Sequence, residues 1–234
     1  MITGIENFMD LYGLYPRYFV AVDCVILGYK NDELNLLLYP RSFEPSKGGW
    51  SLLGGFVQEN ESGDEAAARI LKQTTGLKMI FMEQVMAFSQ PDRDPEARVI
   101  SLAYYALIRI DLHDDECVKE NGAFWIPIRQ LPKLIFDHQQ MFEKALSRLQ
   151  NKAGLSLVGN ELLPEMFTLT QLRKLYEAIF QREFDPGNFR KKILSLDILE
   201  KLSIKDPSES RKGAFYYRVK KDSLDHDIDR IVKP

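Results

Sequence analysis

The segment that most constrains the fold covers residues 54–77 and reads GGFVQENESGDEAAARILKQTTGL. A glycine pair opens it, a polar stretch follows, and an alanine-rich part closes it at Gly76. In that last part, Ala66, Ala67, Ile70, Leu71 and Thr74 recur at short intervals. Spacings of three and four residues place them on one face of a helix. The segment therefore predicts a glycine turn followed by a helix over 62–75 that packs on other elements.

Segments typical of strands surround this helix. Residues 18–27 are β-branched and aromatic, Asn31-Asp32 is typical of a turn, and a leucine-rich run follows over 34–39. Further strands are expected within 51–59, 79–88, 98–110 and 125–127, and an amphipathic helix over 138–150. Strands combined with one internal and one terminal helix indicate a mixed α+β layer structure.

The spacing of Gly55, Glu61, Arg69 and Gly76 resembles the box of Nudix hydrolases, G-x5-E-x7-R-E-U-x-E-E-x-G-U, where U is a bulky apolar residue. Trp50 before the box and PDRDPEARVISLAYYAL after it strengthen the resemblance, which covers roughly residues 15–150. It implies a Nudix-like mixed α/β/α sandwich. It also implies a structural ion pair between the arginine and glutamate of the box.

The chemistry of such a box needs clustered carboxylates, because Mg²⁺ prefers several oxygen ligands in octahedral geometry. In the family, the glutamates of the R-E-U-x-E-E core supply them. This chain has Ile70, Gln73 and Thr74 at those places, although Glu61 and Glu65 remain. We therefore expect no diphosphate hydrolysis, no catalytic residues, no bound metal and no cofactor in this domain.

The residue pattern changes after residues 151–164, which mix small and apolar residues. Thr168 or Thr170 is expected to cap a helix, and Asp185-Pro186 is typical of the start of another. A strand near Ile204, a polar tip over 206–213 and a second strand over 214–219 follow. We expect two domains, at 1–153 and 160–234.

This C-terminal part resembles the winged helix-turn-helix of the Nudix-related transcriptional regulators of the NrtR family. Residues 171–221 carry 13 basic and 7 acidic side chains, in a chain whose net charge is −3. The N-terminal end of a recognition helix reads bases in the major groove, so Asn188, Arg190 and Lys191 are expected to contact bases. The expected phosphate or wing contacts are Arg173, Lys174, Lys192, Arg211 and Lys212. A solvated basic surface is the alternative. A homodimer on a palindromic site is expected, since a single winged helix contacts only a short stretch of DNA.

Within the family, the chain most resembles the Bacteroidetes AraR branch, which regulates arabinose use. We therefore expect a repressor of L-arabinose utilisation genes whose Nudix domain senses the sugar. The expected effector-binding residues are Asp23, Arg41, Trp50, Gln90, Asp92, Arg98 and His138. Structural roles are the alternatives: a local pair for Asp23, core packing for Trp50, a loop ion pair for Asp92 with Arg98, and a helix cap for His138.

Three other functions compete with this interpretation: a regulator that responds to ADP-ribose or NAD metabolites, a residual ADP-ribose pyrophosphatase, and an adaptor that binds protein partners. An adaptor would not need the basic helix and wing. The chain has 234 residues, 45% of them hydrophobic, without an apolar run of about 18 residues, so no membrane partner is expected. Two cysteines without a metal-binding spacing favour a reducing compartment, the cytoplasm.

Overall fold

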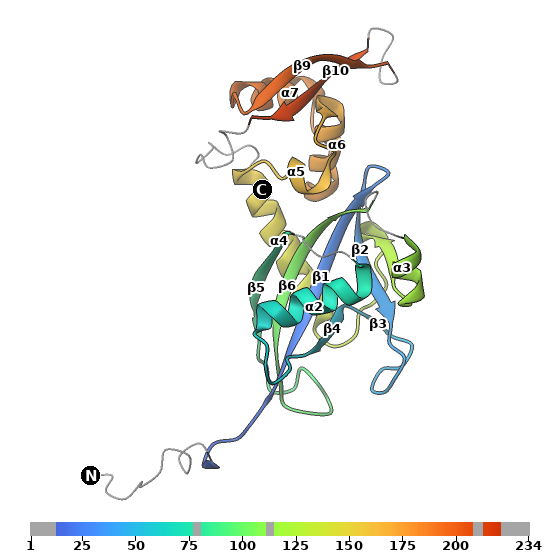
Figure 1. Ribbon diagram of the computed structural model, residues 1–234, viewed down its shortest axis with the longest axis vertical. Coiled ribbons are helices and arrows are strands. Elements are labelled where there is room, and N and C mark those ends of the chain that lie inside the picture. Colours follow the sequence, from blue (N-terminus) through green and yellow to red (C-terminus); the bar gives the residue numbers. More distant parts are fainter. Residues whose placement is uncertain (1–12, 77–80, 111–114, 208–212, 221–234) are drawn as a thin grey trace, which may run out of the picture.

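A mixed β-sheet forms the centre of the N-terminal part, in a computed structural model that describes residues 13–76, 81–110, 115–207 and 213–220 (Figure 1). Its strands run in the order β3-β2-β1-β6-β5, with β4 paired to β1 and β7 paired to β2. The strands are β1 (Phe19–Lys30), β2 (Glu33–Pro40), β3 (Trp50–Ser51), β4 (Leu53–Phe56), β5 (Phe81–Phe88), β6 (Val99–Arg109) and β7 (Phe124–Pro127). The pair β1–β6 is parallel.

The apolar sequence of β1 is explained by burial on both of its faces. Val22, Cys24 and Ile26 belong to one apolar cluster, whereas Val25 and Leu27 belong to the other. Successive side chains of a strand point to opposite faces. A strand covered on both sides therefore reads as a continuous apolar run rather than an alternating one.

Helix α2 (Gly63–Thr75) covers one face of the sheet, as the box pattern predicts. Ser62 caps its start in a capping box with Glu65, and Gly76 ends it with a φ of 73°. Ala66, Ala67, Ile70 and Leu71 of the expected face are buried, but Thr74 is only partly buried and Thr75 is buried instead. Helix α4 (His138–Leu155) covers the other face, and α3 (Asp115–Glu120) and the short 3-10 helix η2 (Ile128–Gln130) lie in the connections.

The predicted end of α4 at residue 150 is wrong, because the helix continues to Leu155. Its last turns are held by burial, since Leu149 and Ala153 are fully buried in the cluster shared with the C-terminal part. The predicted limit of the first domain at residue 153 therefore falls inside a helix. A second short helix, α5 (Gly159–Leu162), follows.

The C-terminal part is a helix-turn-helix followed by a hairpin, as expected. It contains β8 (Phe167–Thr168), α6 (Leu169–Phe180), α7 (Pro186–Ser195), β9 (Leu199–Asp206) and β10 (Ala214–Val219). Thr168 caps α6 in a capping box with Gln171, and the Asp185 carboxylate caps α7 by accepting from the Asn188 backbone N–H at 2.8 Å. Strand β9 begins earlier than the predicted strand near Ile204.

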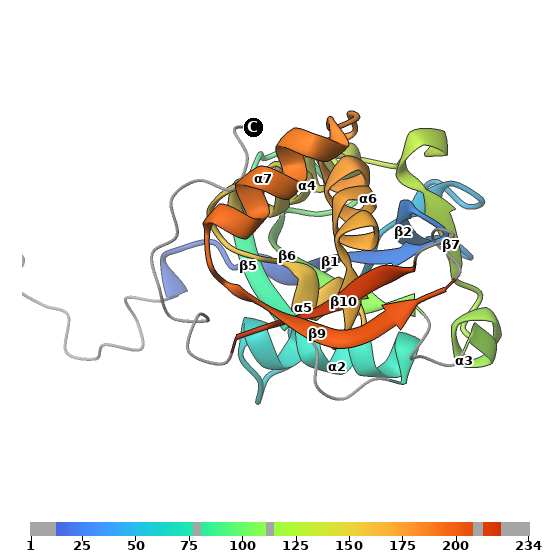
Figure 2. The ribbon, with the colours of Figure 1, turned by 90° about the horizontal axis from the view of Figure 1, so that it is seen from above.

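The two parts share a contact surface between α6 and the elements α4 and β2 (Figures 1 and 2). One apolar cluster runs through both parts and includes Leu149 of α4 together with Leu172 and Tyr176 of α6. The Gln150 side-chain amide of α4 donates a hydrogen bond to the Ile179 carbonyl of α6 at 2.9 Å, so a polar contact also joins the two helices. Within the described residues, no helix combines the length and apolarity that crossing a membrane requires.

Candidate effector cleft and DNA-binding surface

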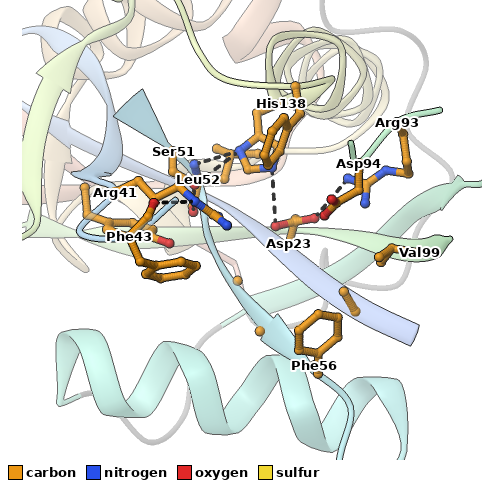
Figure 3. A pocket seen from close by; sticks show the side chains of 15 residues that line it. Asp23, Arg41, Phe43, Ser51, Leu52, Phe56, Arg93, Asp94, Val99 and His138 are labelled. Atoms are coloured by element: carbon orange, nitrogen blue, oxygen red, sulfur yellow. Dashed lines mark hydrogen bonds and ion pairs between the residues drawn. The ribbon is translucent and has the colours of Figure 1, made fainter. Parts of the chain in front are cut away.

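Asp23 is a carboxylate in the middle of the apolar strand β1, and it is 8% exposed. It accepts a hydrogen bond from the Ser101 hydroxyl at 2.6 Å, and Arg93 Nη2 lies 3.4 Å from it. Figure 3 shows it between the side chains of Arg93 and His138. Gly54 is required beside it, because an added Cβ there would lie 2.3 Å from Asp23 Oδ1. Burial of a charge is tolerated only with such partners.

Arg93 is the cation that compensates this carboxylate. Its side chain is 4% exposed and makes two hydrogen bonds to Asp137, from Nε at 2.9 Å and from Nη2 at 2.8 Å. Burial opposes its charge, but the hydrogen bond to Asp137 and the field of Asp23 outweigh burial and hold the pKa of Arg93 above its usual value. The guanidinium thus joins two carboxylates that lie far apart in the sequence.

His138 begins α4 and completes the cluster. Its Nδ1 accepts the Leu52 backbone N–H at 3.1 Å, so the ring proton is on Nε2, which faces Asp23 Oδ1 at 3.7 Å. Burial is the largest influence and lowers the pKa of His138 below its ordinary 6.5, although the nearby carboxylates Asp23 and Asp137 act in the opposite direction. The imidazole is therefore neutral at pH 7.

This lowered pKa predicts a pH-dependent stability. Below about pH 6.5 the unfolded chain takes up a proton at His138 that the folded chain does not, so acidification favours unfolding. Between about pH 7.5 and about pH 5.5, the unfolding free energy of the wild type should therefore fall more than that of His138→Gln. Urea unfolding of both proteins at the two pH values measures this. Equal losses would show that His138 is not the responsible group.

The cluster opens into a cleft of about 130 Å³ that is lined by Asp23, Arg93 and His138 at one side. Arg41 and Phe43 line it from the segment after β2, with the Arg41 guanidinium 4.0 Å from the centre of the Phe43 ring (Figure 3). Buried hydrogen-bonding groups beside an aromatic surface are typical of sites for small polar ligands. This arrangement can bind a compound with several hydroxyl groups.

The structure brings three of the predicted effector residues together in this cleft: Asp23, Arg41 and His138. Trp50 packs against Phe124 with ring centroids 5.9 Å apart, next to the core, as its structural alternative predicts. Arg98 lies over the Tyr18 ring and donates to the Gln90 carbonyl at 3.2 Å. The residues Trp50, Gln90, Asp92 and Arg98 are not among those that line the cleft.

Sequence reasoning missed Arg93, Asp137 and the aromatic residues Phe43 and Phe136. Arg93 lies inside the PDRDPEAR segment that supplied two of the expected residues. Its position between two aspartates favours an exposed loop, and only the fold shows that its side chain turns inward. Asp137, which directly precedes His138, gave no separate signal.

The Nudix box keeps its structural bonds. Arg69 and Glu61 form the expected ion pair at 2.6 Å, and the hydrogen bond from Arg69 lowers the pKa of Glu61. Ile70 is 6% exposed and fills the space above Gly55, where an added Cβ would lie 3.3 Å from Ile70 Cδ1. Among the described residues, no group of three or more His, Cys, Asp or Glu side chains is arranged so that it could hold a metal ion. The residues of this box do not fit a Mg²⁺ ion.

Helix α7 presents the polar face that base recognition requires. Asn188, Arg190 and Lys191 are exposed, whereas Phe189 and Ile193 are buried beneath them. Asn188 and Arg190 lie in the first half of the helix and Lys191 follows directly, and Asp185 caps the N-terminal end. This is the geometry of a helix that enters the major groove.

The predicted phosphate contacts have different surroundings. Lys192 is partly exposed on α7. Arg173 instead pairs with Glu177 on its own helix, and Lys174 pairs with Asp32 at the tip of the β1–β2 hairpin. Arg211 and Lys212 lie outside the described residues. Contacts within the molecule thus engage two of the cations expected to bind DNA.

The NUDIX domain family matches residues 17–145, and the NrtR DNA-binding winged helix domain matches residues 159–219. The chain is 28% identical to the ADP-ribose-responsive transcriptional repressor NtrR of Acinetobacter baylyi, over 94% of this chain and 89% of that protein. It is 36% identical to the ADP-ribose pyrophosphatase of Methanocaldococcus jannaschii, over 56% of this chain and 75% of that protein.

The crystal structure of Shewanella oneidensis NrtR complexed with a 27mer DNA has a TM-score of 0.78 to this chain at 30% identity, and the match covers 92% of this chain and 99% of that one. None of these three relatives is named for arabinose, and the resemblance to the AraR branch remains a prediction. The two domain matches and the likeness along the whole chain show that it belongs to the NrtR family of Nudix-related transcriptional regulators, with a C-terminal winged-helix DNA-binding domain.

Proposed function

We propose that the chain is a transcriptional repressor that binds operator DNA through α7 and responds to a small molecule in the Asp23–Arg93–His138 cleft. The observation that carries the proposal is the combination of an exposed basic recognition helix with a Nudix box whose metal-ligand positions hold Ile70, Gln73 and Thr74. A domain that binds a nucleotide or sugar without converting it serves as a sensor. Such a repressor acts in the cytoplasm, together with the DNA.

ADP-ribose is the first candidate effector. The Acinetobacter baylyi repressor, whose name describes it as responsive to ADP-ribose, matches this chain over 94% of its length. The pyrophosphatase of Methanocaldococcus jannaschii, which matches the Nudix part, is also named for this compound. The cationic Arg41 at the cleft supplies a group that can bind a diphosphate.

L-arabinose is the second candidate, and the size of the cleft favours it. About 130 Å³ is below the roughly 300–1,000 Å³ of pockets that enclose drug-sized ligands. The buried Asp23 and Arg93 also suit the hydroxyl groups of one sugar ring. A pentose is common to both candidates, so binding measurements must distinguish the free sugar from the dinucleotide-like compound.

Calorimetry and operator-binding assays test the proposal together. The chain should bind a duplex from its own upstream region, and the true effector should both bind and weaken that complex. Release by ADP-ribose alone supports the first candidate, and release by L-arabinose alone supports the second. If neither compound binds the protein or releases the DNA, both candidates are refuted. The proposed DNA binding would still stand.

We also propose that the Nudix domain does not hydrolyse its ligand. Incubation of the purified protein with ADP-ribose and Mg²⁺ should yield no AMP above the rate without protein, because Ile70 offers no oxygen ligand and is buried. The Methanocaldococcus jannaschii pyrophosphatase is the positive control in the same assay. Mg²⁺-dependent turnover at an ordinary enzymatic rate would contradict the proposal.

A second copy of the chain is the proposed partner, through the exposed apolar start of β1. Phe19 and Phe56 are 59% and 56% exposed and lie against each other, with ring centroids 5.5 Å apart. Apolar surface of this kind marks interaction sites. Phe19→Ser combined with Phe56→Ser should shift the mass measured by light scattering from dimer to monomer, whereas Phe124→Ser should not. A wild type that is already monomeric would contradict the proposed dimer.

A further inference from the structure

A second cavity, of about 400 Å³, lies at the other end of β1 from the effector cleft. Its walls come from the β1–β2 hairpin, from β7 and from α3. The residues that matter here are Lys30, Glu33, Asn35, Lys119, Phe124 and Trp125. None of them lines the effector cleft, which is the smaller of the two.

The cavity has an aromatic wall because Gly28 leaves room for it. A Cβ at Gly28 would lie 2.5 Å from Ile110 Cγ1 and 3.0 Å from Trp125 Cη2, so the indole lies directly on the backbone of β1. Trp125 is partly buried, and the neighbouring Phe124 is 47% exposed. A flat, fixed and partly open indole is a surface on which a planar ring can stack.

The polar groups of the cavity favour an anion. Lys119 and Lys30 bring two ammonium groups to the lining, although Lys30 already interacts within the chain, against the single carboxylate of Glu33 among the described lining residues. Lys119 is exposed. Asn35 is 8% exposed and donates to the Glu33 carbonyl at 3.0 Å, which fixes its amide at the cavity wall.

From these features we propose that this cavity binds a planar aromatic ring that carries an anionic group, as in an aryl phosphate. The ring stacks on Trp125, and the anion lies toward Lys119. The proposal is independent of the effector cleft. The site adjoins the DNA-binding part, because Asp32, at the tip of the same hairpin, pairs with Lys174 of α6.

Phenyl phosphate is the probe, and the two tryptophans of the chain give an internal reference. An amide correlation spectrum of ¹⁵N-labelled full-length protein resolves one indole N–H signal for each, and Trp50→Phe assigns them. Titration should shift the Trp125 signal saturably and more than the Trp50 signal. Absence of any saturable Trp125 shift up to the solubility of the probe would refute the site.

Two lysine variants locate the anion. Lys119→Ala should weaken phenyl phosphate binding about tenfold, as loss of a charge-assisted contact does. Lys72→Ala removes an exposed lysine on α2 outside the cavity and should leave the affinity unchanged. Equal affinity in Lys119→Ala and the wild type would overturn the proposed recognition of the anion. If phenol, followed by the same Trp125 signal, binds as tightly as phenyl phosphate, the proposed recognition of the anion is overturned as well.

Discussion

Arg93→Met should lower the free energy of unfolding by about 3–5 kcal/mol, the range observed when one partner of a buried ion pair is removed. Arg93 is the cation shared by Asp23 and Asp137, and its side chain is 4% exposed. Methionine fills much of the volume but leaves two nearly buried carboxylates without their cation. Urea unfolding monitored by circular dichroism measures the loss. The variant should also lose effector binding, because the cleft wall depends on this cluster.

The matched control is Arg98→Met, in the same loop. Arg98 lies over the exposed Tyr18 ring and donates to a backbone carbonyl, without a carboxylate partner among the described residues. Its removal should change the unfolding free energy by less than about 1 kcal/mol. Equal destabilisation by both variants would show that the buried cluster does not depend on the charge of Arg93.

Asn188→Ala and Arg190→Ala should each weaken specific DNA binding by about 1–3 kcal/mol, as the loss of a base contact does. Together they should cost the sum if the two contacts are independent. Both side chains are exposed on the first half of α7, so their removal leaves the fold intact. Fluorescence anisotropy with the operator and with a scrambled duplex measures the loss, which should be confined to the operator.

Lys192→Ala tests whether Lys192 contacts a phosphate, which positions the protein on DNA, rather than a base, which gives sequence specificity. A phosphate contact weakens binding to both duplexes alike and reduces the salt slope by about 1. Lys144→Ala, an exposed lysine on α4 in the Nudix part, is the charge-matched control and should leave both affinities unchanged. Operator affinity that is the same in all α7 variants as in the wild type would exclude α7 as the recognition helix.

Much of the fold was predictable because local rules determine it. The caps at Ser62, Thr168 and Asp185, the glycine stop at Gly76 and the apolar stripes of α2, α6 and α7 all depend on residues within a few positions of one another. The end of α4 escaped prediction because its last turns are stabilised by α6, far along the chain.

The candidate site was only partly predictable for the same reason. Asp23 was conspicuous as a charge in an apolar strand, but its partner Arg93 is 70 residues away and Asp137 is another 44 residues from Arg93. A sequence does not show which of several loop cations turns inward. Lys174 illustrates the reverse case, since its basic character suggested DNA but its partner is the hairpin residue Asp32.

The alternation along β1 has a consequence for how this chain tolerates changes of length. Inserting or deleting one residue before Asp23 would reverse the orientation of every later side chain of the strand relative to its neighbours. Val25 and Leu27 would then exchange places with Cys24 and Ile26, and the Asp23 carboxylate would point away from Arg93. Natural variation in length should therefore accumulate in surface loops, such as the one between β2 and β3, and spare this strand.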